Sequence, residues 1–313
     1  MKNTFLLLCS FCLIMFTLYS FKMRNTPKVK GIGIVLKKRV PSAPDKATYK
    51  VINEKQEWNP SETAIIICDM WDQHWCKGAT LRVGELAPQI NKVITVGREK
   101  GMLIVHAPSD CMDYYKDYPQ RKVMLQYKNT NVENRINNDK LPTEKDAVWP
   151  IYQDDGGCNE TPLCKQGRAW EKEIEAIKIN DKDVISDSGV EIAGLFKAKG
   201  IKNVILTGVH TNMCVIGRSF GLRNMVRLGM NVVLMRDMTD AMYDARQWPN
   251  VNHFTGVNLM IEYIEKYVAP TIASTDIIGQ KQFRFKNDKR PVASNAHPFQ
   301  RIETFSLAAN FKL

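Results

Sequence analysis

A cysteine that follows a short apolar run is the strongest chemical feature of this sequence. Val204–Leu206 predicts a buried strand, Thr207 and Gly208 end it, and Cys214 precedes a segment with helical apolar spacing. A thiol at the start of a helix meets unpaired backbone N–H groups and the positive end of the helix dipole. Because the thiolate is the reactive form, we expect a lowered pKa and a nucleophilic role for Cys214. The alternative is a buried cysteine that packs as a small apolar residue.

Two further polar residues end predicted strands. Asp69 closes the apolar run 64–68, and His106 closes the run that begins at Gly101. In open α/β sheets, ligands bind beyond the carboxyl ends of the parallel strands. A carboxylate beside a thiol can take its proton and return it to a leaving amine. Asp69 can equally be a helix N-cap or a loop carboxylate.

The stretch Gly-Val-His-Thr-Asn-Met-Cys-Val at 208–215 resembles the signature of the isochorismatase-like cysteine hydrolases. That family includes nicotinamidases, N-carbamoylsarcosine amidases and isochorismatases. The resemblance covers roughly residues 61–272. It implies an α/β, three-layer Rossmann-like fold with a mostly parallel central sheet.

The same resemblance implies roles for individual residues. Cys214 would be the nucleophile and Asp69 its general base. A cis peptide bond would precede His210, and the amides of His210 and Cys214 would form an oxyanion hole. The expected reaction is hydrolysis of a small amide or related C–N bond through a thioester. Vinyl-ether hydrolysis and a non-catalytic secreted binding protein are the alternatives.

The third catalytic residue of this family is a lysine, and its place in this chain is ambiguous. Counting back from Gly200 without gaps puts Lys182 near it. The residues around Lys182 do not match the Lys-x-x-x-Ser-x-Phe pattern common in the family. Lys178 and His106 are alternatives for the cationic role.

The residues after Asp69 and the second strand bear on the pocket and on metals. In the family, aromatic residues after the base aspartate line the substrate pocket, so we expect Trp71, His74 and Trp75 there, with core packing of the two tryptophans as the alternative. We also expect His106 in the pocket, because it ends the second strand. The Asp-x-His metal motif of nicotinamidases is missing after His106, and there is no glycine-rich phosphate loop. We therefore expect neither a metal nor a cofactor; a site from His74, His106 and Asp110 is the alternative.

Apolar patterning predicts the elements that must position these residues. Continuous apolar runs indicate strands buried on both faces, and 3.6-residue spacing indicates helices. Their alternation favours a parallel α/β sheet. The expected strands are 62–68, 101–106, 203–206 and 231–235, the expected helices are 81–99, 191–199 and 257–268, and 171–179 is expected to be regular.

Charge is distributed unevenly along the chain. Of the net charge of +11, residues 1–60 carry +8 and residues 273–313 carry +4, which leaves −1 for 61–272. A basic excess confined to the flanks fits solvated tails or an anionic surface rather than a nucleic-acid groove. We expect a basic lead-in arm at 25–60 and a basic C-terminal extension at 273–313, whose phenylalanines pack over the domain or a neighbouring subunit.

The N-terminus predicts export. A basic residue precedes the uncharged apolar run 5–21, which is typical of a signal peptide, and basic residues follow it. Residues 1–24 are therefore a cleaved signal or an uncleaved membrane anchor, and the protein would be periplasmic, secreted or membrane-anchored. Export would permit disulfides, and Cys158 and Cys164 are candidates for pairing. A homo-oligomer acting on a small-molecule substrate is expected from the resemblance.

Overall fold

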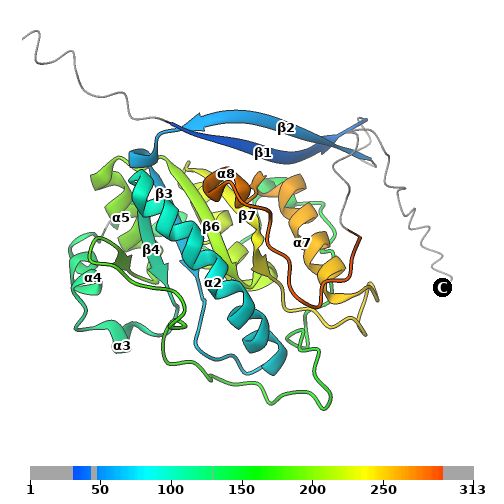
Figure 1. Cartoon of the computed structure of the whole chain (residues 1–313). Coiled ribbons are helices and arrows are strands. Elements are labelled where there is room, and N and C mark those ends of the chain that lie inside the picture. The colour runs from blue at the N-terminus through cyan, green and yellow to red at the C-terminus, as the bar shows by residue number, and fades with distance from the viewer. Residues whose placement is uncertain (1–30, 44–47, 129, 292–313) are drawn as a thin grey trace, which may run out of the picture.

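An eight-stranded sheet forms the middle layer of the computed structural model, which describes residues 31–43, 48–128 and 130–291 (Figure 1). The strand order is β2-β1-β8-β7-β6-β3-β4-β5, and the six strands from β8 to β5 pair in parallel. β1 and β2 form an antiparallel hairpin that joins this sheet through β8. The strands are β1 (Ile32–Pro41), β2 (Tyr49–Trp58), β3 (Thr63–Cys68), β4 (Leu103–Ala107), β5 (Val184–Ile185), β6 (Asn203–Val209), β7 (Asn231–Asp240) and β8 (Thr271–Ile272).

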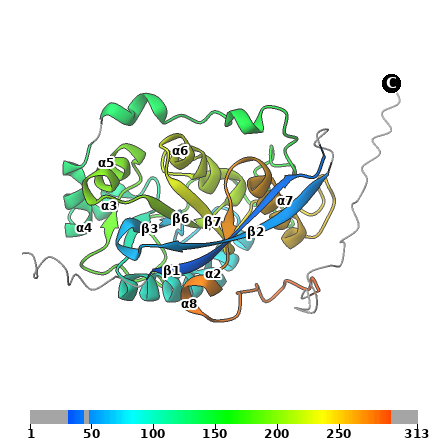
Figure 2. The ribbon, with the colours of Figure 1, turned by 90° about the horizontal axis from the view of Figure 1, so that it is seen from above.

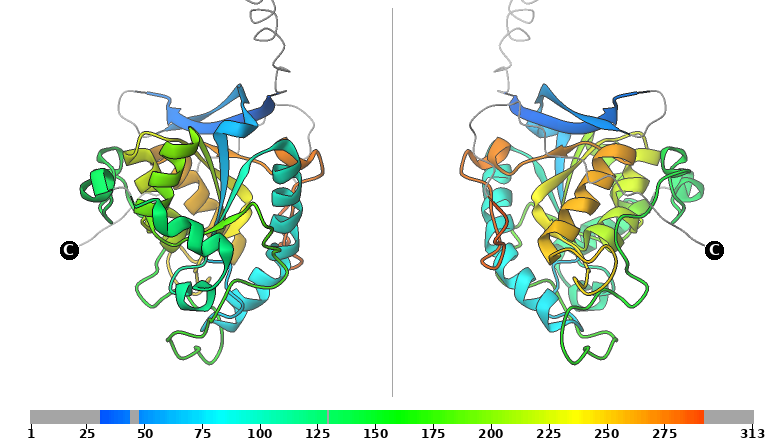
Figure 3. Two further views of the ribbon diagram at one scale, coloured as in Figure 1. Left: turned by 90° about the vertical axis from the view of Figure 1, so that its left-hand side faces the viewer. Right: turned by 90° about the vertical axis from the view of Figure 1, so that its right-hand side faces the viewer.

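Helices cover both faces of the sheet (Figures 2 and 3). α2 and α8 lie on one face, and α5, α6 and α7 lie on the other. The predicted three-layer α/β fold with a mostly parallel sheet is confirmed. The helices are α2 (Lys77–Lys100), α3 (Met112–Tyr115), α4 (Pro119–Lys122), α5 (Gly189–Lys199), α6 (Leu222–Arg227), α7 (His253–Tyr267) and α8 (Thr275–Ile278).

Burial on both faces explains the apolar run Ala64–Cys68 of the central strand β3. Side chains alternate across a strand, so Ala64 and Ile66 enter the core under α5 to α7, whereas Ile65 and Ile67 enter the core under α2. Every residue of β3 is buried. A strand covered on both faces therefore carries apolar side chains at successive positions.

Two predicted segments differ from the structure. Residues 171–179 were expected to be regular, but they form turns with one isolated bridge, between Trp71 and Glu173. The helix expected directly after Cys214 is interrupted: a π-helical turn spans Thr211–Val215, and α6 begins only at Leu222. Gly221 makes that break tight, because a Cβ there would lie 2.8 Å from the Val215 carbonyl oxygen.

The flanks pack onto the central domain as far as the structure describes them. The lead-in residues form the β1–β2 hairpin, and Phe285 of the C-terminal extension is buried and stacks on Phe254 at 5.2 Å. The predicted signal or anchor at 1–24 and residues 292–313 lie outside the described residues. None of the described helices has the length and apolar character needed to span a membrane.

Candidate active site

Three strand ends bring the predicted nucleophile and base together. Asp69 directly follows β3, Ser109 lies just after β4, and Cys214 lies in the turn after β6. The Asp69 carboxylate accepts a hydrogen bond of 2.7 Å from the Ser109 backbone N–H, and the Cys214 thiol lies close enough to lower the pKa of this carboxylate. Asp69 is fully buried, and its backbone has a left-handed φ of 47°. The sequence-based pairing of Cys214 with Asp69 is therefore found in the structure.

A glycine allows β6, the strand that precedes Cys214, to approach β3 closely. Gly208 has φ of 97°, and a Cβ at this position would lie 2.0 Å from the Cys68 carbonyl oxygen. Such a distance is far inside van der Waals contact, so no side chain fits here. Cys68 is the residue before Asp69, so this contact sets the spacing of the two strand ends.

An arginine that the sequence analysis missed completes the cluster. Arg218 lies one helical turn after Cys214, and its backbone N–H donates to the Cys214 carbonyl at 2.9 Å. Its Nε donates to Asp69 Oδ2 at 3.2 Å, and its Nη2 donates to Asp110 at 3.3 Å. Its charge also lies close enough to Cys214 to lower the pKa of the thiol. The i, i+4 spacing of Cys214 and Arg218, which puts both on one helical face, was the available signal.

The pKa values of the pair correct one prediction. Burial, together with the nearby Asp69 carboxylate, raises the pKa of Cys214 far above its usual value, and Arg218 only partly offsets this. The expected lowered pKa is therefore wrong, because the thiol is partly buried and lies beside a carboxylate. Burial likewise raises the pKa of Asp69, although Arg218, Cys214 and Ser109 stabilise the carboxylate. A buried carboxylate of raised pKa is a better proton acceptor than an exposed one.

The cis peptide bond expected before His210 is present between Val209 and His210. The His210 ring is buried, meets the His74 ring edge-on at 4.9 Å, and its Nε2 has no hydrogen-bond partner. Burial holds the pKa of His210 well below its usual value, so the ring is neutral at neutral pH. The oxyanion-hole role of the His210 and Cys214 amides stays a prediction.

The structure does not bring the predicted lysine to this cluster. Lys182 is exposed in the turn before β5 and does not line the cavity that contains Cys214. Lys178 is also exposed, and its backbone contacts Asn91 and Arg98 of α2. Among the described side chains, Arg218 is the cation that contacts both Asp69 and Cys214.

His106 is not a pocket residue, in contrast to the sequence-based expectation. Its Nδ1 lies 2.7 Å from Glu173 and its Nε2 lies 3.2 Å from Asp183, and the ring is fully buried. Burial disfavours the charged ring, but the two carboxylates outweigh burial and raise the pKa of His106 to about 9. His106 is thus a buried imidazolium that ties β4 to the irregular segment before β5.

The three other predicted pocket residues form an aromatic cluster. Trp71 stacks on Trp170 with ring centroids 4.1 Å apart, and its Nε1 donates to the Ser109 carbonyl at 3.0 Å. His74 packs between this pair and Trp75. Cys214 packs against the Trp71 side of the cluster, but these rings do not line the cavity at Cys214. Their contact with substrate stays a prediction.

A polar cavity of about 650 Å³ opens at Cys214. Its walls carry both charges, so it suits a small polar molecule. The lining residues are Ser109, Asp110, Asn138, Asp187, Ser188, Met213, Cys214, Gly217, Arg218, Ser219 and Arg223. Arg223 is held by a bidentate contact with Glu144, and burial raises the pKa of Asp187.

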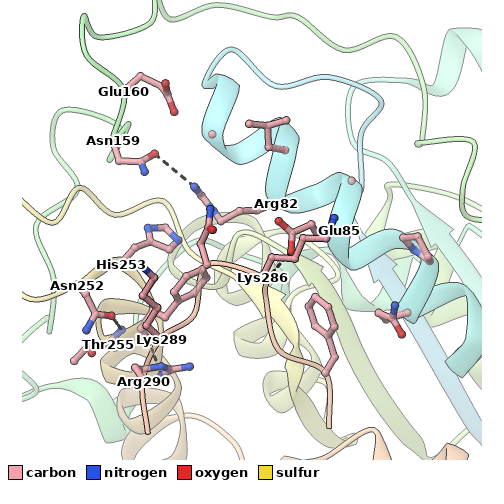
Figure 4. Close-up of a pocket in the computed structure, with 18 of the residues that line it drawn as sticks. Arg82, Glu85, Asn159, Glu160, Asn252, His253, Thr255, Lys286, Lys289 and Arg290 are labelled. Atoms are coloured by element: carbon pink, nitrogen blue, oxygen red, sulfur yellow. Dashed lines mark hydrogen bonds between the residues drawn. The ribbon is translucent and has the colours of Figure 1, made fainter. Parts of the chain in front are cut away.

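A larger cavity of about 1190 Å³ lies away from the cysteine, between α2, the start of α7 and the C-terminal extension (Figure 4). At its inner end, Arg82 and His253 both contact Asp240, at 2.6 and 2.8 Å. It contains neither Cys214 nor Asp69, so we place the chemistry in the smaller cavity. Within the described part of the chain, no group of three or more His, Cys, Asp or Glu residues is arranged to hold a metal ion.

Comparisons with known proteins find structural similarity only. No family model and no curated protein sequence matches the chain. The structure resembles a cysteine hydrolase from Pseudomonas syringae pv. phaseolicola 1448A, at 17% identity and a TM-score of 0.43 over 71% of this chain and 92% of that one. It also resembles a pyrazinamidase from Pyrococcus horikoshii, at 18% identity and a TM-score of 0.39 over 68% and 99% of the two chains.

A third similar structure is an N-carbamoylsarcosine amidase from Thermoplasma acidophilum, at 15% identity and a TM-score of 0.37. The similarity covers 68% of this chain and 96% of that chain. The names of these three proteins are those of a cysteine hydrolase and of two amidases. Because the identities and TM-scores are low, the function proposed below is argued from the residues of this chain.

Proposed function

We propose that this protein is a cysteine hydrolase that cleaves a small, polar amide or a related C–N bond. The observation that carries the proposal is the proximity of the Cys214 thiol, at the wall of a polar cavity, to the buried Asp69 carboxylate, since each group shifts the pKa of the other. Arg218 supports it, because its guanidinium contacts both groups. A nucleophile, an adjacent base and a third group that orients them form the usual arrangement of covalent catalysis.

The proposed reaction begins with transfer of the Cys214 proton to Asp69. The sulfur then attacks the substrate carbonyl carbon, and the amides of His210 and Cys214 hold the oxygen that becomes negative. Asp69 returns the proton to the leaving nitrogen, which departs as the amine or ammonia and leaves a thioester on Cys214. A water molecule, deprotonated by Asp69, hydrolyses the thioester and restores the thiol.

Arg218 has two roles in this scheme. In the resting protein it stabilises the Asp69 carboxylate, whose pKa burial would otherwise raise further. Once Asp69 has taken the proton, the guanidinium faces the Cys214 thiolate and stabilises the new negative charge. A guanidinium remains protonated at any pH at which the protein is folded, so it supplies charge and hydrogen bonds but no proton.

The test is a screen of small amides for release of amine or ammonia, followed by acid quenching and mass spectrometry of the active pair. We expect an acyl group on Cys214, and loss of both adduct and turnover in Cys214→Ala. Cys111→Ala is the matched control, because Cys111 is buried in the same cluster and burial raises its pKa to about 12. Amide turnover retained by Cys214→Ala would contradict the proposal and place the reaction at another site, whereas vinyl-ether hydrolysis without amide turnover would favour the alternative chemistry.

A non-catalytic binding protein is the second candidate, and one observation favours it. Lys182, which the family resemblance placed in the triad, is exposed and away from Cys214. Binding of small amides without turnover, in the wild type and in Cys214→Ala alike, is the result expected for a binding protein. Such a result would also remove any catalytic role for Arg218.

We further propose, from the sequence, that residues 1–24 direct export or anchor the protein, and that the protein is a homo-oligomer. Fractionation of cells that express the full chain or a chain lacking residues 1–24 tests the first point. Retention of the full chain in the cytosol would contradict it. Light scattering of the purified protein measures the mass in solution, and a mass of 35.8 kDa would contradict oligomerisation.

A further inference from the structure

Three cysteines outside the proposed active site gather at the start of α2, and we refer to Cys76, Cys158 and Cys164 as the thiol cluster. The Sγ atoms of Cys76 and Cys158 are 2.9 Å apart, although the residues are 82 positions apart in sequence. Cys164 contacts Cys158. Cys76 and Cys158 are buried, whereas Cys164 is partly exposed.

We propose that the thiol cluster is a redox site in which Cys76 and Cys158 form a disulfide and Cys164 relays oxidising equivalents from solvent. A disulfide bond is about 2.05 Å long, so the two sulfur atoms need to approach by only about 0.9 Å. The expected Cys158–Cys164 pair is, in this scheme, an intermediate rather than the product. The oxidant is a low-molecular-weight disulfide such as oxidised glutathione.

The surrounding structure holds Cys158 firmly opposite Cys76. Gly157 has φ of 66°, and a Cβ on it would lie 2.4 Å from the Met242 carbonyl oxygen, so the chain before Cys158 is pressed against Met242. On the other side, Asn159 lies 3.9 Å from the Cys76 sulfur and 3.5 Å from Arg82 Nη1 (Figure 4). Formation of the disulfide therefore needs little movement of either backbone.

The pKa values of Cys76 and Cys158 determine which of the two thiols attacks first. Burial opposes ionisation of Cys158, but hydrogen bonds from Cys76 and from the backbone of Glu160 and Cys164 outweigh burial and lower its pKa. Burial raises the pKa of Cys76 to about 12. Cys158 therefore ionises before Cys76, so it is the member of the pair that attacks the mixed disulfide on Cys164. Cys76 attacks last, and must first lose its proton.

The exchange balances in three steps. Cys164 attacks the small disulfide and releases one thiolate, which leaves a mixed disulfide on Cys164. Cys158 then attacks the Cys164 sulfur and releases the second thiolate. Finally Cys76 attacks the Cys158 sulfur, and its proton passes to the Cys164 thiolate that leaves. Overall, two protein thiols become one disulfide, and one small disulfide becomes two small thiols.

The cluster also adjoins the nucleophile turn. It packs against Met213, the residue before Cys214. In addition, Met242, on which Gly157 rests, exchanges two backbone hydrogen bonds of 2.9 Å with the Asn212 side chain. The disulfide would therefore fix the loop that carries Cys158 against the turn that carries Cys214.

The test uses the full-length protein, reduced, desalted and then incubated with oxidised glutathione. We expect two of the eight thiols to disappear and unreduced peptide mapping to find Cys76 linked to Cys158. The melting temperature should rise by about 5–10 °C and fall again on reduction. A glutathione adduct on Cys214 adds mass, whereas the disulfide removes two hydrogen atoms, so the two products are distinguishable.

Two variants test separately the disulfide between Cys76 and Cys158 and the relay role of Cys164. Cys76→Ser should lose the disulfide and the rise in melting temperature, whereas the matched Cys164→Ser should form the same disulfide about tenfold more slowly. A final product linking Cys158 to Cys164, or no loss of thiols in the wild type, would overturn the proposal. Formation in Cys164→Ser at the wild-type rate would overturn the relay.

Discussion

The buried imidazolium at His106 makes a pH-dependent contribution to stability that can be worked out from the structure. Its pKa is about 9 in the folded protein because Glu173 and Asp183 flank it, and about 6.5 in an unfolded chain. A group whose pKa is raised by folding stabilises the fold fully below its unfolded pKa and loses that contribution as pH rises through its folded pKa. The shift corresponds to about 3 kcal/mol, lost between about pH 6.5 and pH 9.

The perturbation is His106→Gln, which keeps hydrogen-bonding capacity and removes the charge. Urea unfolding at half-unit steps from pH 6 to pH 9.5 gives the free energy of unfolding of both proteins. The difference between wild type and variant should shrink by about 3 kcal/mol across that range. Subtracting the free energy of unfolding of the variant from that of the wild type cancels the contributions of other titrating groups. One of these is His74, whose lowered pKa of about 4 in the folded protein lies below the pH range of the experiment. Two curves that run parallel from pH 6 to pH 9.5 would refute the assignment of His106 as a buried cation.

Three further changes address the active site and its scaffold. Asp69→Asn should lower kcat/KM for the amide substrate by about 10²–10⁴-fold without unfolding the protein. In the wild type, kcat/KM should fall as acidification protonates Asp69, whose pKa is raised. Full activity of Asp69→Asn would contradict the role of Asp69 as a base. In steady-state assays, Arg218→Gln should lower kcat/KM by about 10²-fold, whereas Lys182→Gln should leave it unchanged. The reverse outcome would assign the third catalytic role to Lys182 instead of Arg218. Gly208→Ala should destabilise the protein by about 3 kcal/mol or more in urea titrations, because its Cβ would overlap the Cys68 carbonyl; an unaltered midpoint would contradict the close approach.

The sequence predicted the central strands because their signal is local. In β3 the run Ala64–Cys68 is apolar throughout, and a continuous run of that length is itself the pattern of a strand covered on both faces. Asp69 and Cys214 were predicted for a related reason, since each lies at or just after the end of such a run and parallel strands bring their carboxyl ends together.

The remaining site residues depend on contacts that linear patterns do not contain. His106 meets Glu173 and Asp183, which lie 67 and 77 positions further along the chain in a segment without regular structure. The pKa of Cys214 depends on how deeply its sulfur is buried, and the sequence showed only that it lies near a helical segment. Lys182 was placed by gapless counting, which fails where the spacing between strand and helix changes.

The position of Arg218 on the helical turn that carries Cys214 has a consequence for how the site tolerates motion. The sulfur and its counter-cation belong to one short stretch of chain, joined through the hydrogen bond from the Arg218 amide to the Cys214 carbonyl. A displacement of that turn moves both groups as a unit, so their mutual alignment survives fluctuations that change their distance to Asp69. Grafting this single turn onto another β-strand end that already bears a buried carboxylate would therefore transfer the thiol and its stabilising guanidinium together.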